Sequence, residues 1–238
     1  MTAITVDRLT KRYGELVAVD DLSFEVRRGA VTGFLGPNGA GKTTTLKMVL
    51  GLAHPTEGRA LVAGRPYAAL DEPARTVGAV LEGGLFHPGR SGRAHLRVQA
   101  KAAGLPPDRV EEVLGLVGLE AAAGKRVGGY SLGMRQRLGL ATALLGEPEI
   151  LVLDEPANGL DPAGIRWLRT FLRGFADDGG TALVSSHLLA EVAQAVDDVV
   201  VIGHGRCLAQ GPIEGLVDPD ASLEDVYLDL TGTTEVLR

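Results

Sequence analysis

Residues 31–45 read VTGFLGPNGAGKTTT, an apolar run followed by a glycine-rich turn and three threonines. The turn has the spacing G-x-x-x-x-G-K-T, with Gly36 as its first residue and Lys42 and Thr43 as its last two. The apolar, β-branched residues before the turn predict a strand, and the apolar spacing after it predicts a helix that ends at Gly51. A turn of this spacing between a strand and a helix is typical of a phosphate-binding loop, so we expect a polyphosphate site here.

Each residue type in this loop suits one part of phosphate binding. Glycines tolerate positive φ angles, which let successive backbone N–H groups point into one nest, and the helix N-terminus adds positive partial charge. We expect Lys42 to reach the β- and γ-phosphates and the hydroxyl of Thr43 to be a Mg²⁺ ligand. The residues expected to hold the phosphates are Gly36, Pro37, Asn38, Gly39, Ala40, Gly41, Lys42, Thr43 and Thr44.

The composition restricts the class of protein around this loop. The chain has 238 residues, of which 45% are apolar, enough for one large α/β domain with a substantial core. No apolar run approaches the ~20 residues of a membrane span, and residues 1–12 lack the apolar centre of a signal peptide, so we expect a cytosolic chain. The single cysteine, Cys207, excludes an internal disulfide framework. A net charge of −6 disfavours a general nucleic-acid binder.

Short strands are predicted on both sides of the loop. Residues 4–6 and 22–26 alternate between apolar and polar, and residues 59–63 and 76–81 are two further strand candidates. Tyr13 lies between the first two strands. Its ring either stacks on an adenine base or packs within a hairpin, and the local pattern favours neither.

A helical block follows the short strands. From Ser91 to about Gly129 the apolar residues recur with a helical period, so we expect an inserted helical subdomain. We expect its arginines, Arg90, Arg93 and Arg97, on a solvated helix face, with contact to a partner as the alternative.

Ser131 begins another helical run, which continues to Gly146. Serine is a favoured N-cap, and the start of a helix exposes unpaired N–H groups and a positive dipole end. The local pattern favours an ordinary capped helix, with a second anion-binding site as the alternative.

Two later strands each end in residues that carry chemistry. Residues 150–153 are continuously apolar, which is typical of a strand covered on both faces, and they lead into Asp154 and Glu155. We expect Asp154 to bind the metal through its water shell and Glu155 to accept a proton from the attacking water. Residues 181–186 repeat the pattern and lead into His187, which could hydrogen-bond a γ-phosphate. We expect the other four histidines at surface or structural positions.

The order of these features resembles the ATP-binding-cassette (ABC) ATPases. The resemblance runs from Tyr13 to the final hairpin at residues 203–211, and residues 130–137, YSLGMRQR, and 223–228, LEDVYL, are similar to the antibiotic-export type. It implies an α/β fold with a P-loop NTPase (RecA-like) core, a mixed, largely parallel sheet, an N-terminal antiparallel β subdomain and a helical insert. The implied boundaries are residues 1–84 with 146–211 for the core, 85–145 for the helical subdomain with the signature helix, and 212–238 for a C-terminal tail.

The resemblance also implies how the chain acts. In this family two cassettes, identical or related, meet head to tail, and each ATP lies between one chain's phosphate loop and the other chain's helix start at Ser131 and Gly133. Tyr13 would stack on adenine, Asp161 would communicate between the two sites, and His187 would be the switch histidine. Catalysis would rest on Lys42, Glu155 and His187, and Mg²⁺ would bind Thr43 and Asp154. The dimer would drive export through a separate multi-span membrane protein from the inner face of the cell membrane, with no nucleic-acid partner.

The sequence departs from the family pattern at two places. Glu82 stands where most cassettes have a glutamine that touches Mg²⁺ and water, and as a third metal ligand it would add negative charge near the phosphates. In the signature, Leu132 and Met134 replace a glycine and a glutamine, while Gly133 is kept. Two alternatives to the transport function are kept: a soluble cassette ATPase acting on DNA or ribosomes, and a regulatory ATP-binding module with low turnover, which Glu82 and Leu132 motivate.

Overall fold

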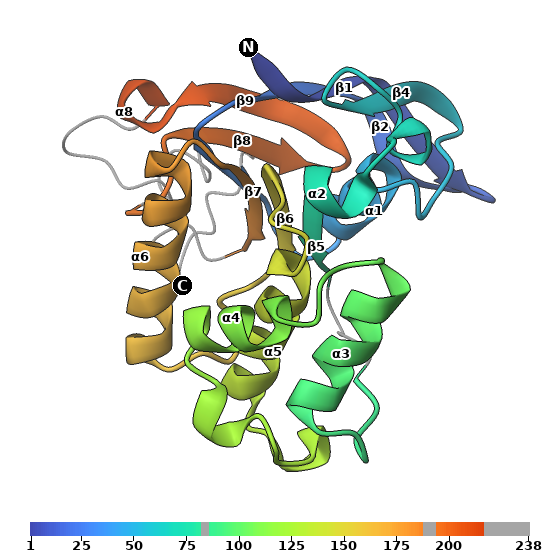
Figure 1. Cartoon of the computed structure of the whole chain (residues 1–238). Helices are drawn as coiled ribbons and strands as arrows, with labels where there is room; N and C mark the ends of the chain where they lie inside the picture. The colour runs from blue at the N-terminus through green and yellow to red at the C-terminus, as the bar shows by residue number, and fades with distance from the viewer. Residues whose placement is uncertain (82–85, 188–193, 217–238) are drawn as a thin grey trace.

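The computed structural model describes residues 1–81, 86–187 and 194–216 (Figure 1). Its strands form two sheets, one of three strands and one of six. Three sequence-based expectations fall outside the described residues: Glu82, the motif at 223–228, and most of the C-terminal tail at 212–238. No helix in the described part of the chain is long and apolar enough to cross a membrane.

The larger sheet places the phosphate loop at its centre. Its strand order is β5-β6-β7-β3-β8-β9, and every neighbouring pair is parallel except β8 with β9. The bounds are β3 Val31–Leu35, β5 Val77–Val80, β6 Ile150–Asp154, β7 Thr181–Ser186, β8 Asp198–Gly203 and β9 Arg206–Pro212. Every residue of β3, β6 and β7 is buried, because both faces of the sheet are covered. The prediction of a mixed, largely parallel sheet is confirmed.

The smaller sheet is antiparallel and has the order β2-β1-β4. Its strands are β1 Thr2–Tyr13, β2 Leu16–Arg27 and β4 Glu57–Val62. The first two are much longer than the predicted residues 4–6 and 22–26. Their pairing is irregular, and Arg8 and Asp21 have positive φ angles of 46° and 50°. Such irregularities shift the inward and outward alternation, so a search for strict alternation finds only the regular part of each strand.

Three helices lie together at one end of the molecule (Figure 1), two from the predicted helical block and one from the helical run that begins at Ser131. They are α3 Gly92–Ala102, α4 Arg109–Leu116 and α5 Leu132–Leu144. Leu96 and Ala100 of α3 are buried, whereas Val98 is 47% exposed. Val98 is exposed because a residue two positions from a buried one lies on the other side of a helix. His95 is buried edge-on to the ring of Phe86, and burial lowers its pKa, with the charge of Arg90 as a smaller cause.

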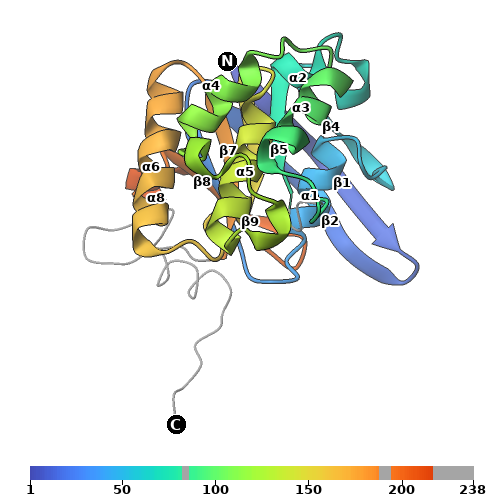
Figure 2. The same ribbon diagram turned by 60° about the horizontal axis from the view of Figure 1, so that its bottom comes forward.

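Two hydrophobic clusters lie on opposite faces of the large sheet. Leu151 and Leu153 of β6 belong to the cluster that includes α6 Pro162–Asp177 and the helical block, whereas Ile150 and Val152 belong to the one that includes α1 Lys42–Val49 and the small sheet. Phe24 of β2 stacks on Phe34 of β3 with ring centroids 5.1 Å apart, which joins the two sheets. Figure 2 shows α6 and α1 on opposite sides of the molecule.

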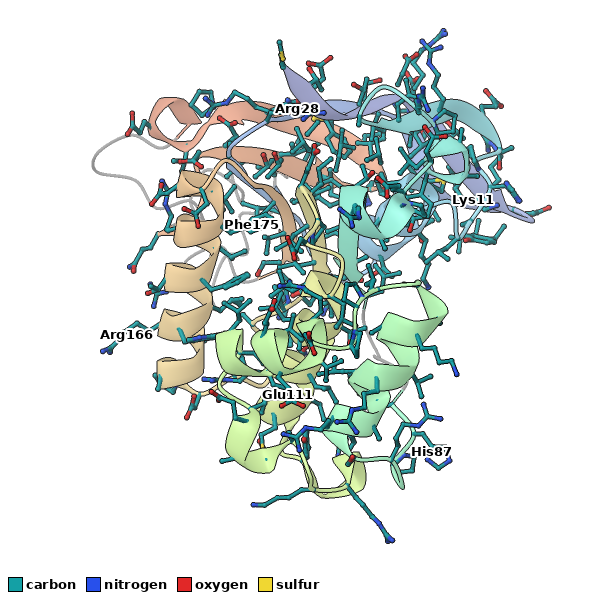
Figure 3. The ribbon with its side chains drawn as sticks, in the orientation of Figure 1. Lys11, Arg28, His87, Glu111, Arg166 and Phe175 are labelled. Atoms are coloured by element: carbon teal, nitrogen blue, oxygen red, sulfur yellow. The ribbon has the colours of Figure 1, made fainter. Side chains whose placement is uncertain are left out.

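Helix α6 shows the division between core and solvent clearly. Phe175 lies between α6 and the strands, while Arg166 points away from the molecule (Figure 3). The remaining short elements are the 3₁₀ turns η1 Tyr67–Ala69, η2 Glu120–Ala122 and η3 Val127–Gly129, and the helices α2 Pro73–Thr76 and α8 Ile213–Leu216.

Gly78 of β5 lets α5 pack directly on the edge of the large sheet. A Cβ atom at this position would lie 2.2 Å from the carbonyl oxygen of Ala143 in α5. We therefore expect Gly78→Ala to lower the free energy of unfolding by about 1–3 kcal/mol, because the added methyl group forces α5 away from the strand. Urea unfolding would measure this, with Ala79→Val, at an exposed position of the same strand, as the control expected to change stability by at most about 0.5 kcal/mol. Equal stability of Gly78→Ala and the wild type would contradict the tight packing.

Candidate active site

The phosphate loop joins β3 to α1, and two of its glycines are required by neighbouring backbone. A Cβ atom at Gly36 would lie 2.5 Å from the carbonyl oxygen of Ile202, and one at Gly41 would lie 2.5 Å from that of Ala18. Gly39 and Gly41 also have positive φ angles of 81° and 100°. The loop can therefore adopt this curvature only with glycine, and it leaves an open cradle at the N-terminus of α1.

Lys42 carries a buried positive charge within this cradle. Its side chain is 6% exposed, and its Nζ donates to the carbonyl oxygens of Gly36 at 2.7 Å and Pro37 at 3.2 Å. The same Nζ lies 3.2 Å from Oε1 of Glu155 at the end of β6. The ammonium group is thus surrounded by three oxygen atoms, as a buried cation must be.

Asp154 ends β6 and is held through both of its carboxylate oxygens. Oδ2 accepts a hydrogen bond of 2.8 Å from Oγ1 of Thr43, and Oδ1 accepts one from Oγ of Ser185 in β7. Two predicted metal ligands, Thr43 and Asp154, are therefore brought into direct contact. These hard oxygen donors are the type that Mg²⁺ prefers, and Mg²⁺ commonly takes only one or two protein ligands beside water and phosphate oxygens. The described residues contain no cluster of three or more histidine, cysteine or acidic side chains that could hold a metal by themselves.

Glu155 lies between the two other residues expected to act in catalysis. Its Oε1 faces Lys42, and its Oε2 lies 2.7 Å from Nδ1 of His187 and accepts a bond of 3.4 Å from the backbone N–H of His187. Lys42, Glu155 and His187 thus form one continuous polar network, and the structure brings the three predicted catalytic residues together.

A cavity of about 550 Å³ opens over this network. It is lined by Tyr13, Leu16, Ala18, Pro37, Asn38, Gly39, Gly41, Lys42, Thr43, Thr44, Glu155, Asn158 and His187. Tyr13 is half exposed at the end of β1, and the Nζ of Lys11 lies 4.9 Å from the centroid of its ring. The exposed ring is accessible for stacking, which supports the first of the two interpretations of Tyr13.

Leu16, Ala18 and Asn158 line the cavity but were not among the predicted site residues. Asn158 lies in the turn after β6, only a few residues after Asp154 and Glu155 in the sequence. This short distance along the chain could have identified Asn158 as a site residue. Leu16 and Ala18 follow Tyr13 on β2, where neither side chain has a chemical signature, so only the fold places them beside the loop.

Five predicted ATP-contacting residues do not line this cavity, three outside the phosphate loop and two within it. Ser131 is exposed and caps α5, its Oγ accepting a bond of 3.2 Å from the N–H of Met134. Gly133 follows it in the first turn of α5, and Asp161 caps α6 by accepting a bond of 2.7 Å from the N–H of Gly164. Gly36 and Ala40 shape the loop without lining the cavity. The structure therefore leaves Ser131 and Gly133 outside the cavity over the phosphate loop, whereas Leu132, Arg135 and Gln136 of α5 line a separate cavity of about 490 Å³ that reaches Asp154 and Glu155.

A glycine-rich phosphate loop on the central strand of a largely parallel sheet, with an acidic pair at the end of a nearby strand, defines a P-loop nucleoside triphosphatase. The family model described as "ABC transporter" matches residues 19–158. The chain belongs to the ABC transporter family, and it is an ATP-binding and ATP-hydrolysing subunit of that family.

Individual relatives agree with this family. The bacitracin transport ATP-binding protein of Bacillus licheniformis is 43% identical over 218 residues, 90% of this chain and 71% of that protein. The lantibiotic transport ATP-binding protein of Streptococcus pyogenes is 34% identical over 224 residues, which are 94% of this chain and 95% of that protein. The predicted resemblance to the antibiotic-export type is confirmed, which favours the transport function over the two alternatives.

Solved structures share the fold. The ATP-binding subunit of an ABC transporter superposes with a TM-score of 0.86 at 30% identity, covering 97% of this chain and 100% of that one. A dimeric bacterial ABC transporter cassette superposes with a TM-score of 0.81 at 22% identity, covering 89% and 99%. A further structure, cbiO1 of Clostridium perfringens, is described as part of an ABC transporter complex and superposes with a TM-score of 0.77 at 29% identity, covering 90% of each chain.

Asp161 has two possible roles: it caps α6 by accepting a hydrogen bond from Gly164, and its charge could carry communication between the two ATP sites. Substitutions can separate these two roles. We expect Asp161→Ala to lower the free energy of unfolding by about 1 kcal/mol because α6 loses its N-cap, whereas Asp161→Asn keeps the cap and the stability. Chemical denaturation measures the first effect, and ATP hydrolysis at increasing ATP concentration measures the second. A stable Asp161→Asn variant with altered cooperativity of hydrolysis would support communication between sites, and one identical to the wild type would leave only the cap.

Proposed function

We propose that two copies of this chain, or this chain and a related cassette, close around ATP and drive export through a separate multi-span membrane protein. One observation carries this proposal: the two groups of residues that we expect to hold the phosphates lie apart within one chain. Lys42, Glu155 and His187 gather in one cavity, while Ser131 presents the free start of α5 outside it. A second chain arranged head to tail would place its helix start over this cavity, where the N–H groups and the dipole favour phosphate oxygens.

Different residues of the site are proposed to bind different parts of Mg-ATP. Tyr13 offers a ring face to adenine, and the cradle between Gly36 and Thr44 holds the phosphates. Thr43 and Asp154 are proposed to hold Mg²⁺, with Glu82 as a third proposed ligand that lies outside the described residues. When bound, this ion neutralises part of the phosphate charge.

Hydrolysis would then depend on freeing Glu155 for its task as a base. In the structure Glu155 is shared between Lys42 and His187. Phosphates attract the ammonium group of Lys42, which leaves the carboxylate of Glu155 able to accept the proton of the attacking water. In this structure His187 contacts the carboxylate through Nδ1, and it is proposed to donate a ring N–H to the γ-phosphate when ATP is bound. Hydrolysis removes the bridging phosphate and lets the dimer reopen.

Replacing Glu155 tests both the dimer and the base. We expect Glu155→Gln to hydrolyse ATP about 10²–10⁴-fold more slowly and to remain an ATP-bound dimer, which light scattering detects. Lys42→Ala is the control, because without the ammonium group it should bind no ATP and stay monomeric under the same conditions. A Glu155→Gln variant that is monomeric in Mg-ATP, or that hydrolyses ATP as fast as the wild type, would contradict the assignment.

The location and the partner are tested by purification. The relatives named for bacitracin and lantibiotic transport support a site of action at the inner face of the cell membrane. We expect the tagged chain, extracted from its native membranes in mild detergent, to bring a multi-span membrane protein in a fixed ratio, identified by mass spectrometry. The untagged chain is the control. Recovery of only ribosomal, DNA-bound or other soluble proteins would overturn the export proposal and leave the ATPase activity standing.

A further inference from the structure

Ser185 lies beside both carboxylates of the site, although the sequence pattern assigned it no role. It belongs to β7, which runs parallel to β6, and its Cα is the register partner of Asp154. The side chain is completely buried, with 0% exposed. A hydroxyl group at this depth needs partners for its donor and its acceptor functions.

The partners of Ser185 are consecutive residues with different tasks. Its Oγ donates a hydrogen bond to Oδ1 of Asp154 and accepts one of 3.0 Å from the backbone N–H of Glu155. The carbonyl oxygen of Ser185 accepts a second, longer bond of 3.2 Å from the same N–H. A hydroxyl group can donate and accept at once, whereas alanine or valine at this position could do neither through its side chain.

The bond to Glu155 matters because the backbone there is in an unfavourable conformation. Glu155 has a φ of 49°, in the left-handed region that residues with a Cβ atom avoid. The two oxygens of Ser185 hold the N–H of Glu155 in this turn. The same turn directs the Glu155 carboxylate toward Lys42 and His187. The orientation of this carboxylate therefore depends on the contact with Ser185.

The bond to Asp154 matters for the proposed metal site. Asp154 is fixed by Thr43 through Oδ2 and by Ser185 through Oδ1. Thr43 is itself a proposed metal ligand, so its hydroxyl serves the ion when one is bound. Ser185 is not a ligand, and its bond can therefore orient Asp154 in both situations. Partners of this kind typically change metal affinity or activity by about 10–100-fold when they are removed.

We propose that Ser185 is a positioning residue. Its hydroxyl group orients the proposed metal ligand Asp154 and the proposed base Glu155 relative to each other. The proposal rests on the roles given to Asp154 and Glu155 in the proposed function. A merely structural role, in which Ser185 only satisfies its own buried hydroxyl group, predicts a loss of stability without a specific effect on the metal or on turnover.

Thr181 provides a matched control on the same strand. It is 2% exposed, and its Oγ1 accepts a hydrogen bond of 3.0 Å from the N–H of Gly29 at the opposite end of β7 from the site. Thr181→Ala therefore removes a buried hydroxyl group bonded to backbone, as Ser185→Ala does, but far along the strand from Asp154 and Glu155. Ser185→Cys keeps the size of the side chain while weakening the donor.

The test compares these variants for the free energy of unfolding, for Mg²⁺ dependence and for turnover. In Ser185→Ala we expect kcat to fall by about 10–100-fold with the KM for ATP within about twofold of wild type. The Mg²⁺ concentration that half-saturates the ATP-induced rise in Tm should increase about tenfold, while binding of ATP in EDTA stays unchanged. Ser185→Cys should lie between, and Thr181→Ala should lose stability only.

The outcomes separate this proposal from the proposed function. Wild-type kcat and wild-type Mg²⁺ dependence in Ser185→Ala would overturn the positioning role, as would equal losses in Ser185→Ala and Thr181→Ala. Asp154→Asn and Glu155→Gln serve as reference variants. If Asp154→Asn keeps the wild-type Mg²⁺ dependence and Glu155→Gln keeps the wild-type turnover, the roles of the carboxylates are wrong. If Asp154→Asn loses the Mg²⁺ dependence and Glu155→Gln loses turnover while Ser185→Ala changes neither, only the role of Ser185 is wrong.

Discussion

The buried ion pair between Lys42 and Glu155 is the constraint on which the rest of this structure depends. A charged ammonium group removed from water is tolerated only with oxygen partners close by, and here they come from the phosphate loop and from the end of β6. These segments are distant in sequence, so the pair can form only because β7 lies between β3 and β6 with all three strands parallel. The order of strands in the large sheet is thus a requirement of the site.

The same sheet explains why the site is open on one side. The two hydrophobic clusters cover its faces, and α5 is attached at the edge formed by β5, where Gly78 allows close contact. Helix α5 therefore stands away from the phosphate loop at the centre of the sheet. Its cap Ser131 and its first residue Leu132 are exposed, so the N–H groups of the first turn that the cap leaves unbonded can reach a group that does not belong to this site. The separation of the phosphate loop from the start of α5 follows from the fold itself.

The sequence predicted the features that have a local chemical signature. The phosphate loop, the acidic end of β6 and the strand that leads to His187 were all recognisable because each combines a buried strand with polar residues at its end. Features that depend on register or on irregular backbone were not. Strands β1 and β2 were predicted too short because of their irregular pairing near Arg8 and Asp21. Ser185 gave no signal, because only the alignment of β7 with β6 shows that it lies opposite Asp154.

The contacts of the site also determine what ATP binding can contribute in the proposed function. Lys42 already has three oxygen partners, and Thr43 already has the carboxylate of Asp154. Phosphates and Mg²⁺ would therefore exchange existing interactions for new ones, and the net gain within one chain is smaller than the number of new contacts suggests. Among the residues that the structure describes, the start of α5 has no such oxygen partner beyond its serine cap. In the proposed function, a second chain that brings this start to the phosphates would add interactions without breaking others, and closure of the dimer would be the step in which the binding energy of ATP becomes available for transport.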